Sequence, residues 1–251
     1  MELNEKHLPL GAILSISWNI VKRHILTILA VTLIIYIPIE ILLCLIPFDK
    51  LDSYHSFTSY VRVTQVLELL FGVLATMGIA FLVENHIQGR TLGAGDVLKK
   101  AVNRWPSAVG TNIIAGLIIM GLTLLLIIPG VIWSVYYIFR TFVVVLRMKS
   151  GSEALKYSKS LVVRKWWKVF GYTFVFGIVT IGAASILGVI VGLFWDNFIV
   201  DFILGVITDI MMSFFIVAQT VFFLNLDYTQ TNPVPANESL IPETSQVSTQ
   251  Y

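Results

Sequence analysis

The sequence predicts an all-α, polytopic membrane protein with six transmembrane helices in three hairpins. Of the 251 side chains, 57% are hydrophobic and only 13% are charged, roughly half the charged share of a soluble domain. Six apolar runs are each long enough to cross a hydrocarbon layer about 30 Å thick. These runs are apolar on all sides, without the period-two alternation of a transmembrane barrel. The small share of charged residues and the six long apolar runs exclude most soluble enzymes.

The six predicted spans cover residues 25–46, 66–83, 108–128, 131–146, 169–194 and 198–224. Pro129 and Gly130 separate the third span from the fourth. Residues 108–146 are far more than one crossing needs, so a tight hairpin is favoured over one kinked helix. The fourth span is short, and a tilted or partly re-entrant path is an alternative to a full crossing.

The distribution of basic residues predicts the orientation. Fourteen of the 17 Lys and Arg residues lie before the first span or in the connections from the second to the third and from the fourth to the fifth. Excess Lys and Arg mark the cytoplasmic side of a membrane protein. We therefore expect a plasma or inner membrane protein with both termini in the cytoplasm.

A repeated element precedes the first, third and fifth spans. Amphipathic helices are predicted at about residues 10–23, 96–105 and 152–165, and Pro106 is expected to end the second. Each is expected to lie at the headgroup level, with Lys and Arg near anionic lipid and Trp in the interfacial belt. Anchoring of the bundle is the favoured role, and a regulatory or lipid-sensing role is the alternative.

The residues expected at this interface fall into two sets. The basic residues expected to contact lipid headgroups are Lys22, Arg23, Lys99, Lys100, Arg104, Lys156, Lys159, Arg164, Lys165 and Lys168. The interfacial aromatic residues are Trp18, Trp105, Trp166 and Trp167. In the third helix, the inward stripe is expected to be Leu155, Ser158, Leu161 and Val162.

Three stretches carry a family resemblance: Ile128-Pro129-Gly130 through Arg140, Gly151 through Ser158, and Arg164 through Gly171 with its Trp-Trp pair. They resemble the membrane region of the glycerophosphodiester phosphodiesterase membrane-domain superfamily and the YciC-like six-span membrane proteins grouped with it. The resemblance implies a fold and a membrane location. It implies no diesterase activity, because the soluble catalytic domain of the phosphodiesterase is absent from this sequence.

Residue patterns for catalysis or cofactor binding are not found. The four His residues are dispersed and form no His-x-x-x-His or Glu-x-x-His pair, and the single Cys44 cannot form an intramolecular disulfide. Phosphate-binding glycine loops and the Gly-x-Ser-x-Gly elbow are also missing. We expect no metal, no cofactor, no nucleic-acid partner and no enzymatic activity.

Three ionisable residues lie well inside the predicted spans: Glu40, Arg140 and Asp209. Counted at 1.5 Å per residue, they lie about 9, 14 and 17 Å below the outer boundary, so they are expected to form one polar cluster centred on Arg140. A structural salt bridge between helices is the favoured interpretation. A water-filled substrate or ion path, and no contact at all, are the alternatives.

Two further features concern assembly and the C-terminus. Ala184, Gly188 and Gly192 form a small-residue ridge, expected to serve packing within the chain, with homo-oligomerisation as the alternative. Residues 229–251 are polar without Lys or Arg and are expected to be a disordered cytoplasmic tail, so that residues 1–228 form the transmembrane domain.

These observations favour a non-enzymatic membrane scaffold or lipid-interacting component, whose protein partner the sequence does not indicate. The alternative is a small transporter or permease with Glu40, Arg140 and Asp209 in its path.

Overall fold

The computed structural model describes residues 8–46, 53–90, 92–194 and 198–232, and this part of the chain is almost entirely helical. Six helical spans are long and apolar enough to cross a membrane. The spans are Ile25–Leu43, Thr58–Ile87, Ala94–Leu125, Ile127–Leu146, Trp166–Val191 and Phe202–Thr231. The all-α, polytopic fold class is therefore confirmed.

The first hairpin follows a separate amphipathic helix, α1 (Leu10–Arg23). Helix α2 (Ile25–Leu45) leads up to the hairpin tip, and α3 (Ser53–Leu67), η2 (Glu68–Gly72) and α4 (Val73–Ile87) return from it as one helical path. The second span is longer than the predicted 66–83, because polar residues near its outer end stay helical although they lower the local hydropathy. Segment η2 is a π-helical turn, which inserts an extra residue into the helix.

The second hairpin begins with α5 (Ala94–Leu125), a single helix. The expected separate helix at 96–105 is continuous with the third span, and Pro106 lies inside α5 rather than ending it. A proline forfeits one backbone hydrogen bond and tends to kink a helix, but the turns on both sides of Pro106 remain helical.

A tight turn joins the third and fourth spans as predicted, but it lies at Leu126, whose backbone is extended, and not at the expected Pro129 and Gly130. Pro129 falls in the first turn of α6 (Ile127–Tyr136), where backbone N–H groups have no partner within the helix anyway. The fourth span is then interrupted at residues 137–139 before α7 (Arg140–Leu146). This span is therefore two short helices rather than one.

The third hairpin follows α8 (Gly151–Val162) and consists of α9 (Trp166–Phe194) and α10 (Phe198–Thr231). Helix α10 continues beyond the predicted span end at residue 224 and includes the first residues of the expected tail. The remainder of that tail, residues 233–251, lies outside the described residues.

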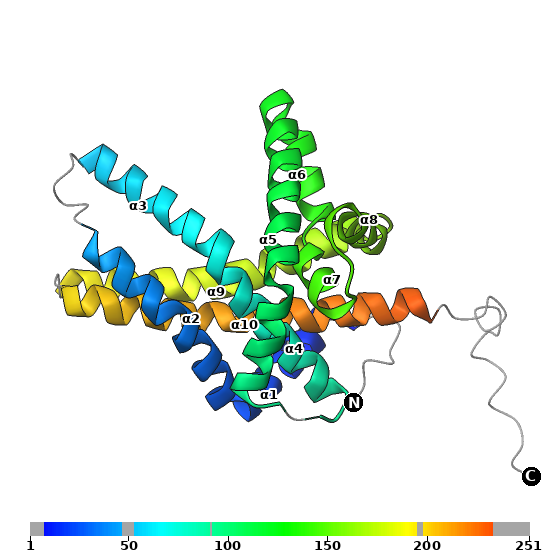
Figure 1. The fold of residues 1–251 in the computed structure, drawn as a ribbon, viewed down its shortest axis with the longest axis horizontal. Coiled ribbons are helices and arrows are strands. Elements are labelled where there is room, and N and C mark those ends of the chain that lie inside the picture. Colours follow the sequence, from blue (N-terminus) through cyan, green and yellow to red (C-terminus); the bar gives the residue numbers. More distant parts are fainter. Residues whose placement is uncertain (1–7, 47–52, 91, 195–197, 233–251) are drawn as a thin grey trace, which may run out of the picture.

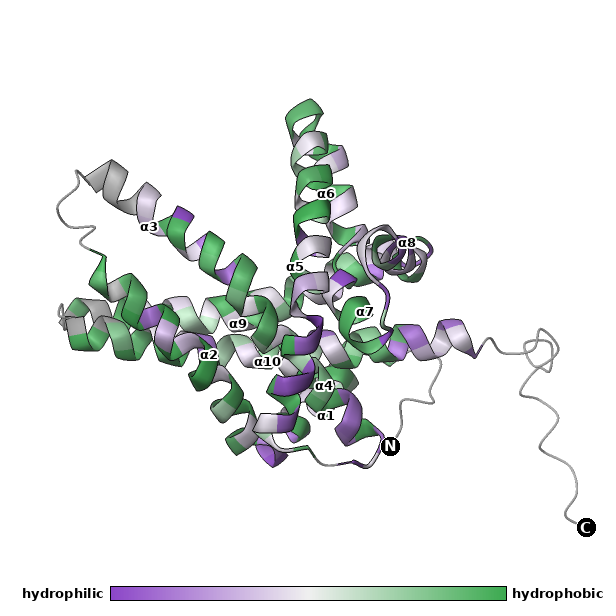
Figure 2. Cartoon of the chain, viewed as in Figure 1, coloured by the Kyte–Doolittle hydropathy of each residue, from purple (hydrophilic) through white to green (hydrophobic). Residues whose placement is uncertain are grey.

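The three hairpins meet at a common base, and their tips point in different directions (Figure 1). The base is built from α1, α4, α7, α8 and part of α10, and its buried residues include Phe139, Phe222 and Phe223, which pack ring against ring. Hydrophilic residues gather at the C-terminal end of α10 and near the start of α5, whereas the α5–α6 tip is apolar (Figure 2). An exposed apolar tip is what a hydrocarbon surrounding requires.

Within the base, helices α1 and α8 each bury one face against neighbouring helices. Helix α8 buries Leu155, Ser158, Leu161 and Val162, which confirms the predicted stripe. Helix α1 packs mainly against α10 and buries Ile13, Ser17 and Ile20, while Trp18, one of the expected interfacial residues, is 54% exposed.

Candidate functional site

The predicted intramembrane cluster is only partly assembled. Asp209 lies within electrostatic range of Glu40 and of Glu68, a third carboxylate on η2. Glu40 lies against Gly205 of α10, and Tyr36 of α2 donates a hydrogen bond to Glu68. Carboxylates from α2, η2 and α10 therefore come together, and Glu68 is a member that the sequence analysis did not include, because it lies only two residues inside the predicted span 66–83.

Arg140 does not join Glu40 or Asp209 in an ion pair in the described part of the chain, so the expected salt bridge is not formed. Its Nε donates to Oδ1 of Asn112 at 2.5 Å, and its Nη1 donates to the carbonyl of Tyr137 at 3.1 Å. Thr141 also donates to Oδ1 of Asn112, at 3.4 Å. Arg140 begins α7, directly after the interrupted segment, and this break turns it toward α5 and η2.

A polar pocket of about 430 Å³ lies between α3, η2, α4, α5 and α7. Its polar lining residues are Thr64, Gln65, Glu68, Thr76, Asn112, Arg140 and Thr141. Arg140 and Glu68 thus face one cavity without making an ion pair with each other.

A second ionic network, at the base, was not identified from the sequence. Arg147 Nη1 contacts Glu84 Oε1 at 2.6 Å, and Arg147 Nη2 contacts Asp227 Oδ2 at 2.7 Å. Tyr157 of α8 donates to the other oxygen of Asp227 at 2.6 Å. Burial opposes the charge of Arg147, but the bonds to Asp227 and Glu84 outweigh burial and raise the Arg147 pKa. The network ties α4, α7, α8 and α10 together.

The sequence contained a signal for this network. Glu84 and Asp227 are acidic residues near the basic ends of two spans, at about the level at which Arg147 ends the fourth. Arg147 was counted only among the basic residues that predict orientation, so its pairing with these two acidic residues was not recognised.

Ser158 of α8 forms hydrogen bonds with backbone groups at the interruption of the fourth span. Its hydroxyl accepts the backbone N–H of Phe139 at 3.2 Å and donates to the carbonyl of Tyr136 at 2.8 Å. An unpaired backbone group inside a membrane protein is costly. One fully buried hydroxyl therefore satisfies groups on both sides of the break.

Two histidines meet where α1, α2 and α4 converge. Nε2 of His24 lies 2.8 Å from Nδ1 of His86, so one ring donates an N–H hydrogen bond to the other. Burial and the neighbouring Arg23 lower the pKa of His24. The pair links the start of the first span to the end of the second.

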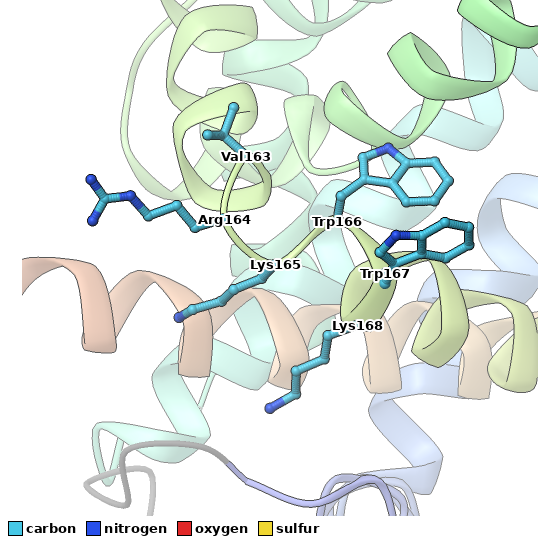
Figure 3. Close-up of a pocket in the computed structure, with 6 residues that line it drawn as sticks. All are labelled: Val163, Arg164, Lys165, Trp166, Trp167 and Lys168. Carbon is cyan, nitrogen blue, oxygen red and sulfur yellow. The ribbon is translucent and has the colours of Figure 1, made fainter.

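The basic pocket lies at the junction of α8 and α9. It has a volume of about 690 Å³ and is lined by the six consecutive residues Val163, Arg164, Lys165, Trp166, Trp167 and Lys168. The three basic side chains extend to one side of this junction and the two indoles to the other (Figure 3).

Few protein acceptors are available to these basic groups. Lys165 Nζ donates to Thr229 Oγ1 at 3.2 Å, and Lys168 Nζ reaches the carbonyl of Leu8 at 3.5 Å. Neither lysine nor Arg164 has a carboxylate partner in the described ranges. Burial, and next the nearby Lys168, lower the pKa of Lys165.

An apolar groove adjoins the basic pocket. Its volume is about 480 Å³, and it shares Trp166 and Trp167 with the basic pocket. Its other lining residues come from one face of α6, namely Ile127, Ile128, Val131, Ile132 and Tyr136. Trp166 is fixed by stacking on Phe170 at 5.2 Å between ring centroids and by a hydrogen bond to the Ile132 carbonyl at 3.3 Å, whereas Trp167 is 79% exposed.

The other predicted headgroup residues are dispersed over the base. Lys22 lies over the ring of Trp18, Lys100 over Phe81, and Lys159 over Trp133. Arg23, Lys99 and Lys156 are exposed, and Arg104 is half-buried. Trp105 is turned inward, where it stacks on Phe71 and donates to the carbonyl of Leu70. Of the predicted basic residues, Arg164, Lys165 and Lys168 line a common pocket.

In the small-residue ridge, Gly188 faces Leu204 of α10 within the same chain, 3.9 Å from the position that a β-carbon would occupy. The side chain position at Gly192 lies outside the described residues. Among the residues that the structure describes, no group of three His, Cys, Asp or Glu side chains could hold a metal ion.

Comparisons with known proteins add no assignment. No family model matches the chain, and no curated protein or solved structure matches it. The resemblance to the phosphodiesterase membrane-domain superfamily stays a prediction.

Proposed function

We propose that this multi-pass membrane protein is a non-enzymatic, lipid-interacting component that binds an anionic phospholipid at the α8–α9 junction. The headgroup phosphate lies among Arg164, Lys165 and Lys168, and an acyl chain lies in the groove between α6 and the Trp166–Trp167 pair. The junction of the basic pocket with the apolar groove is the observation that supports this function.

The chemistry of the two compartments matches the two parts of a phospholipid. Arginine and lysine bind phosphate oxygens through charge-assisted hydrogen bonds, and an anion would neutralise the charge that Lys165 and Lys168 share. Tryptophan favours the depth at which headgroup and acyl chain meet. The basic residues for the phosphate and the tryptophans for this depth all lie within residues 163–168.

The length of the apolar groove also fits that of an acyl chain in one leaflet. From Tyr136 to Ile127 the α6 face extends over nine residue steps, about 14 Å at 1.5 Å per residue. One leaflet contributes about half of the 30 Å hydrocarbon thickness. A lipid with its phosphate at the basic pocket would therefore place its chain alongside α6. The proposal places this basic side in the cytoplasmic leaflet of the plasma or inner membrane.

The direct test is the affinity of the detergent-purified protein for a short-chain phosphatidylglycerol, measured by calorimetry. We expect the triple variant Arg164→Gln, Lys165→Gln, Lys168→Gln to bind at least tenfold more weakly, a change of ~1.4 kcal/mol. The matched control is Lys99→Gln, Lys100→Gln, Arg104→Gln, which removes the same charge from α5.

Equal losses in the two triple variants would show only a general attraction of charge and would contradict the site. The affinity for short-chain phosphatidylcholine should be weaker than that for phosphatidylglycerol in the unmodified protein. The purified protein should release no headgroup from either lipid; steady turnover would contradict the non-enzymatic part of the proposal.

A further inference from the structure

The polar pocket beside Arg140 lies at a second place on the molecule, away from the α8–α9 junction. Its volume of about 430 Å³ is in the range of small-molecule sites. Two departures from regular helix border it: the π-helical turn η2, which carries Glu68, and the interruption that precedes Arg140. Irregular backbone at membrane depth is tolerated where it lines a cavity, and π-helical turns are frequent at functional sites.

Arg140 has hydrogen-bonding capacity that the protein does not use. A guanidinium carries five N–H donors, and in the described part of the chain Arg140 directs two of them, to Asn112 and to Tyr137. Asn112 fixes the plane of the guanidinium because its oxygen accepts from Nε at 2.5 Å. Donors remain for an anionic oxygen acid within the pocket.

Glu68 lines the same pocket and is the acidic residue among its lining side chains. Tyr36 donates a hydrogen bond to its carboxylate, which orients Glu68. In the described residues no Lys or Arg forms an ion pair with Glu68. Thr64, which also lines the pocket, has a buried hydroxyl oxygen without a hydrogen-bond partner.

The arrangement of charges selects the ligand. A purely anionic ligand at Arg140 would be repelled by Glu68, and a purely cationic ligand at Glu68 would be repelled by Arg140. A ligand that carries both an anionic oxygen acid and an ammonium group satisfies both walls, and the threonine hydroxyls can bond its remaining polar atoms.

We infer that the pocket between η2, α5 and α7 is a binding site for a small zwitterion, whose anionic group is held by Arg140 and whose ammonium group is held by Glu68. Two sources offer this chemistry: the headgroup of a phosphatidylethanolamine and a free solute of amino-acid type. Asn112 is the positioning residue that holds the guanidinium fork toward the cavity.

The test measures dissociation constants for the full chain in detergent, with phosphoethanolamine, glycine and dihexanoyl phosphatidylethanolamine as zwitterionic probes. Inorganic phosphate and ethanolamine are the probes with a single kind of charge. We expect at least one zwitterion to bind tenfold or more tightly than both single-charge probes. If only the diacyl probe binds, the source is a lipid headgroup; if phosphoethanolamine or glycine binds as well, the source includes free solutes.

Two charge variants, together with their affinity for phosphatidylglycerol, complete the test. Arg140→Gln and Glu68→Gln should each weaken binding of the zwitterion at least tenfold. Both variants should retain the phosphatidylglycerol affinity of the unmodified protein, which shows that they are folded. The Arg164→Gln, Lys165→Gln, Lys168→Gln variant should in turn retain zwitterion binding, so the two sites fail or succeed separately.

Three results would overturn the inference. One is phosphate binding as tight as phosphoethanolamine binding, which would indicate an anion site. Another is unchanged zwitterion affinity in a folded Glu68→Gln or Arg140→Gln protein. The third is the absence of measurable binding of every zwitterionic probe to the unmodified protein.

Discussion

Two arginines flank the short helix α7, and their surroundings assign them different roles. Arg147, just after the last residue of α7, is held by Glu84 and Asp227 at 2.6 and 2.7 Å. Arg140, the first residue of α7, contacts neutral groups only in the described chain. A charge matched by carboxylates stabilises the fold, whereas an unmatched charge beside a cavity is available to a ligand.

Tyr157→Phe tests the base network at the level of one hydroxyl. Burial, together with Asp227, raises the pKa of Tyr157 to about 12, whereas an unfolded tyrosine titrates near 10. The protonated phenol therefore stabilises the fold fully below about pH 10, and this contribution is lost as the pH rises through about 12. We expect the variant to be less stable by about 1 kcal/mol at neutral pH.

The measurement is the difference in thermal unfolding temperature between the two proteins in detergent as a function of pH. This difference should shrink between about pH 10 and pH 12, because titration of all other groups cancels. Tyr228→Phe on the exposed surface of α10 should show almost no difference at any pH. A Tyr157→Phe difference that stays constant would refute the assigned hydrogen bond.

Ser158→Ala tests the hydrogen bonds that Ser158 forms at the interruption of the fourth span. The substitution removes the partner of the Phe139 N–H and of the Tyr136 carbonyl, so both are left unpaired at a cost of about 2 kcal/mol. Hydrogen exchange at Phe139 should accelerate. Ser160→Ala is the control, because Ser160 lies on the exposed face of α8; similar exchange at Phe139 in both variants would contradict the role of Ser158.

For single residues, the sequence predicted which side chains are buried better than it predicted which residues form hydrogen bonds or ion pairs with each other. The 3.6-residue period placed Leu155, Ser158 and Leu161 on the buried face of α8. It could not indicate that Ser158 bonds Phe139 and Tyr136, because that contact depends on where the fourth span is interrupted. The Arg140 salt bridge failed for a related reason: depth along the membrane normal says nothing about which side of a helix bundle a residue faces.

At the scale of helices, the amphipathic elements preceding the odd-numbered spans do not behave alike. Helices α1 and α8 are separate, whereas the equivalent residues before the third span are the first turns of α5. A proline lowers the stability of a helix interior but does not by itself reverse the helix direction. Hydropathy fixed the number of spans, and tertiary packing determined which boundaries became breaks.

Gly130→Ala tests the close contact at the tip of the second hairpin. A β-carbon at Gly130 would lie 3.0 Å from the backbone Cα of Thr123, so α5 and α6 would have to move apart. We expect a loss of about 1–3 kcal/mol, the usual cost of overpacking. Gly121→Ala on α5 is the control, because its β-carbon would meet nothing within 4 Å.

Thermal unfolding in detergent distinguishes these two glycine variants. Gly121→Ala should be neutral or slightly stabilising, since alanine favours helix over glycine. If Gly130→Ala were equally neutral, the α5–α6 hairpin would not pack as closely as the structure has it.

At the scale of the whole molecule, polar chemistry is concentrated at the common base and in the pockets that open between the hairpins. The α5–α6 tip exposes Leu124 and Ile128 at 81% and 74%, as expected for side chains surrounded by lipid tails. The base carries the Arg147 network and the basic pocket, and hydrophilic residues gather at the C-terminal end of α10 (Figure 2).

The sequence predicted the basic and aromatic residues of the α8–α9 junction, because Lys, Arg and Trp at a span entry have a known preference for the membrane interface. It could not predict the apolar groove beside them. That groove needs α6 to lie next to Trp166, a contact between residues more than 30 positions apart. The carboxylate-lined pocket was hidden for the same reason, since its walls come from α3, η2, α4, α5 and α7.

The most direct test of the proposed lipid site uses tryptophan fluorescence in vesicles that contain equal parts of phosphatidylglycerol and phosphatidylcholine, with the acyl chains of one lipid brominated. Bromine quenches only nearby indoles, and the signal lost in a Trp166→Phe, Trp167→Phe variant identifies the contribution of the junction. We predict stronger quenching of that contribution by brominated phosphatidylglycerol than by brominated phosphatidylcholine. The preference should disappear in the Arg164→Gln, Lys165→Gln, Lys168→Gln protein and persist in the Lys99→Gln, Lys100→Gln, Arg104→Gln protein. Equal quenching by the two lipids in the unmodified protein would contradict the account.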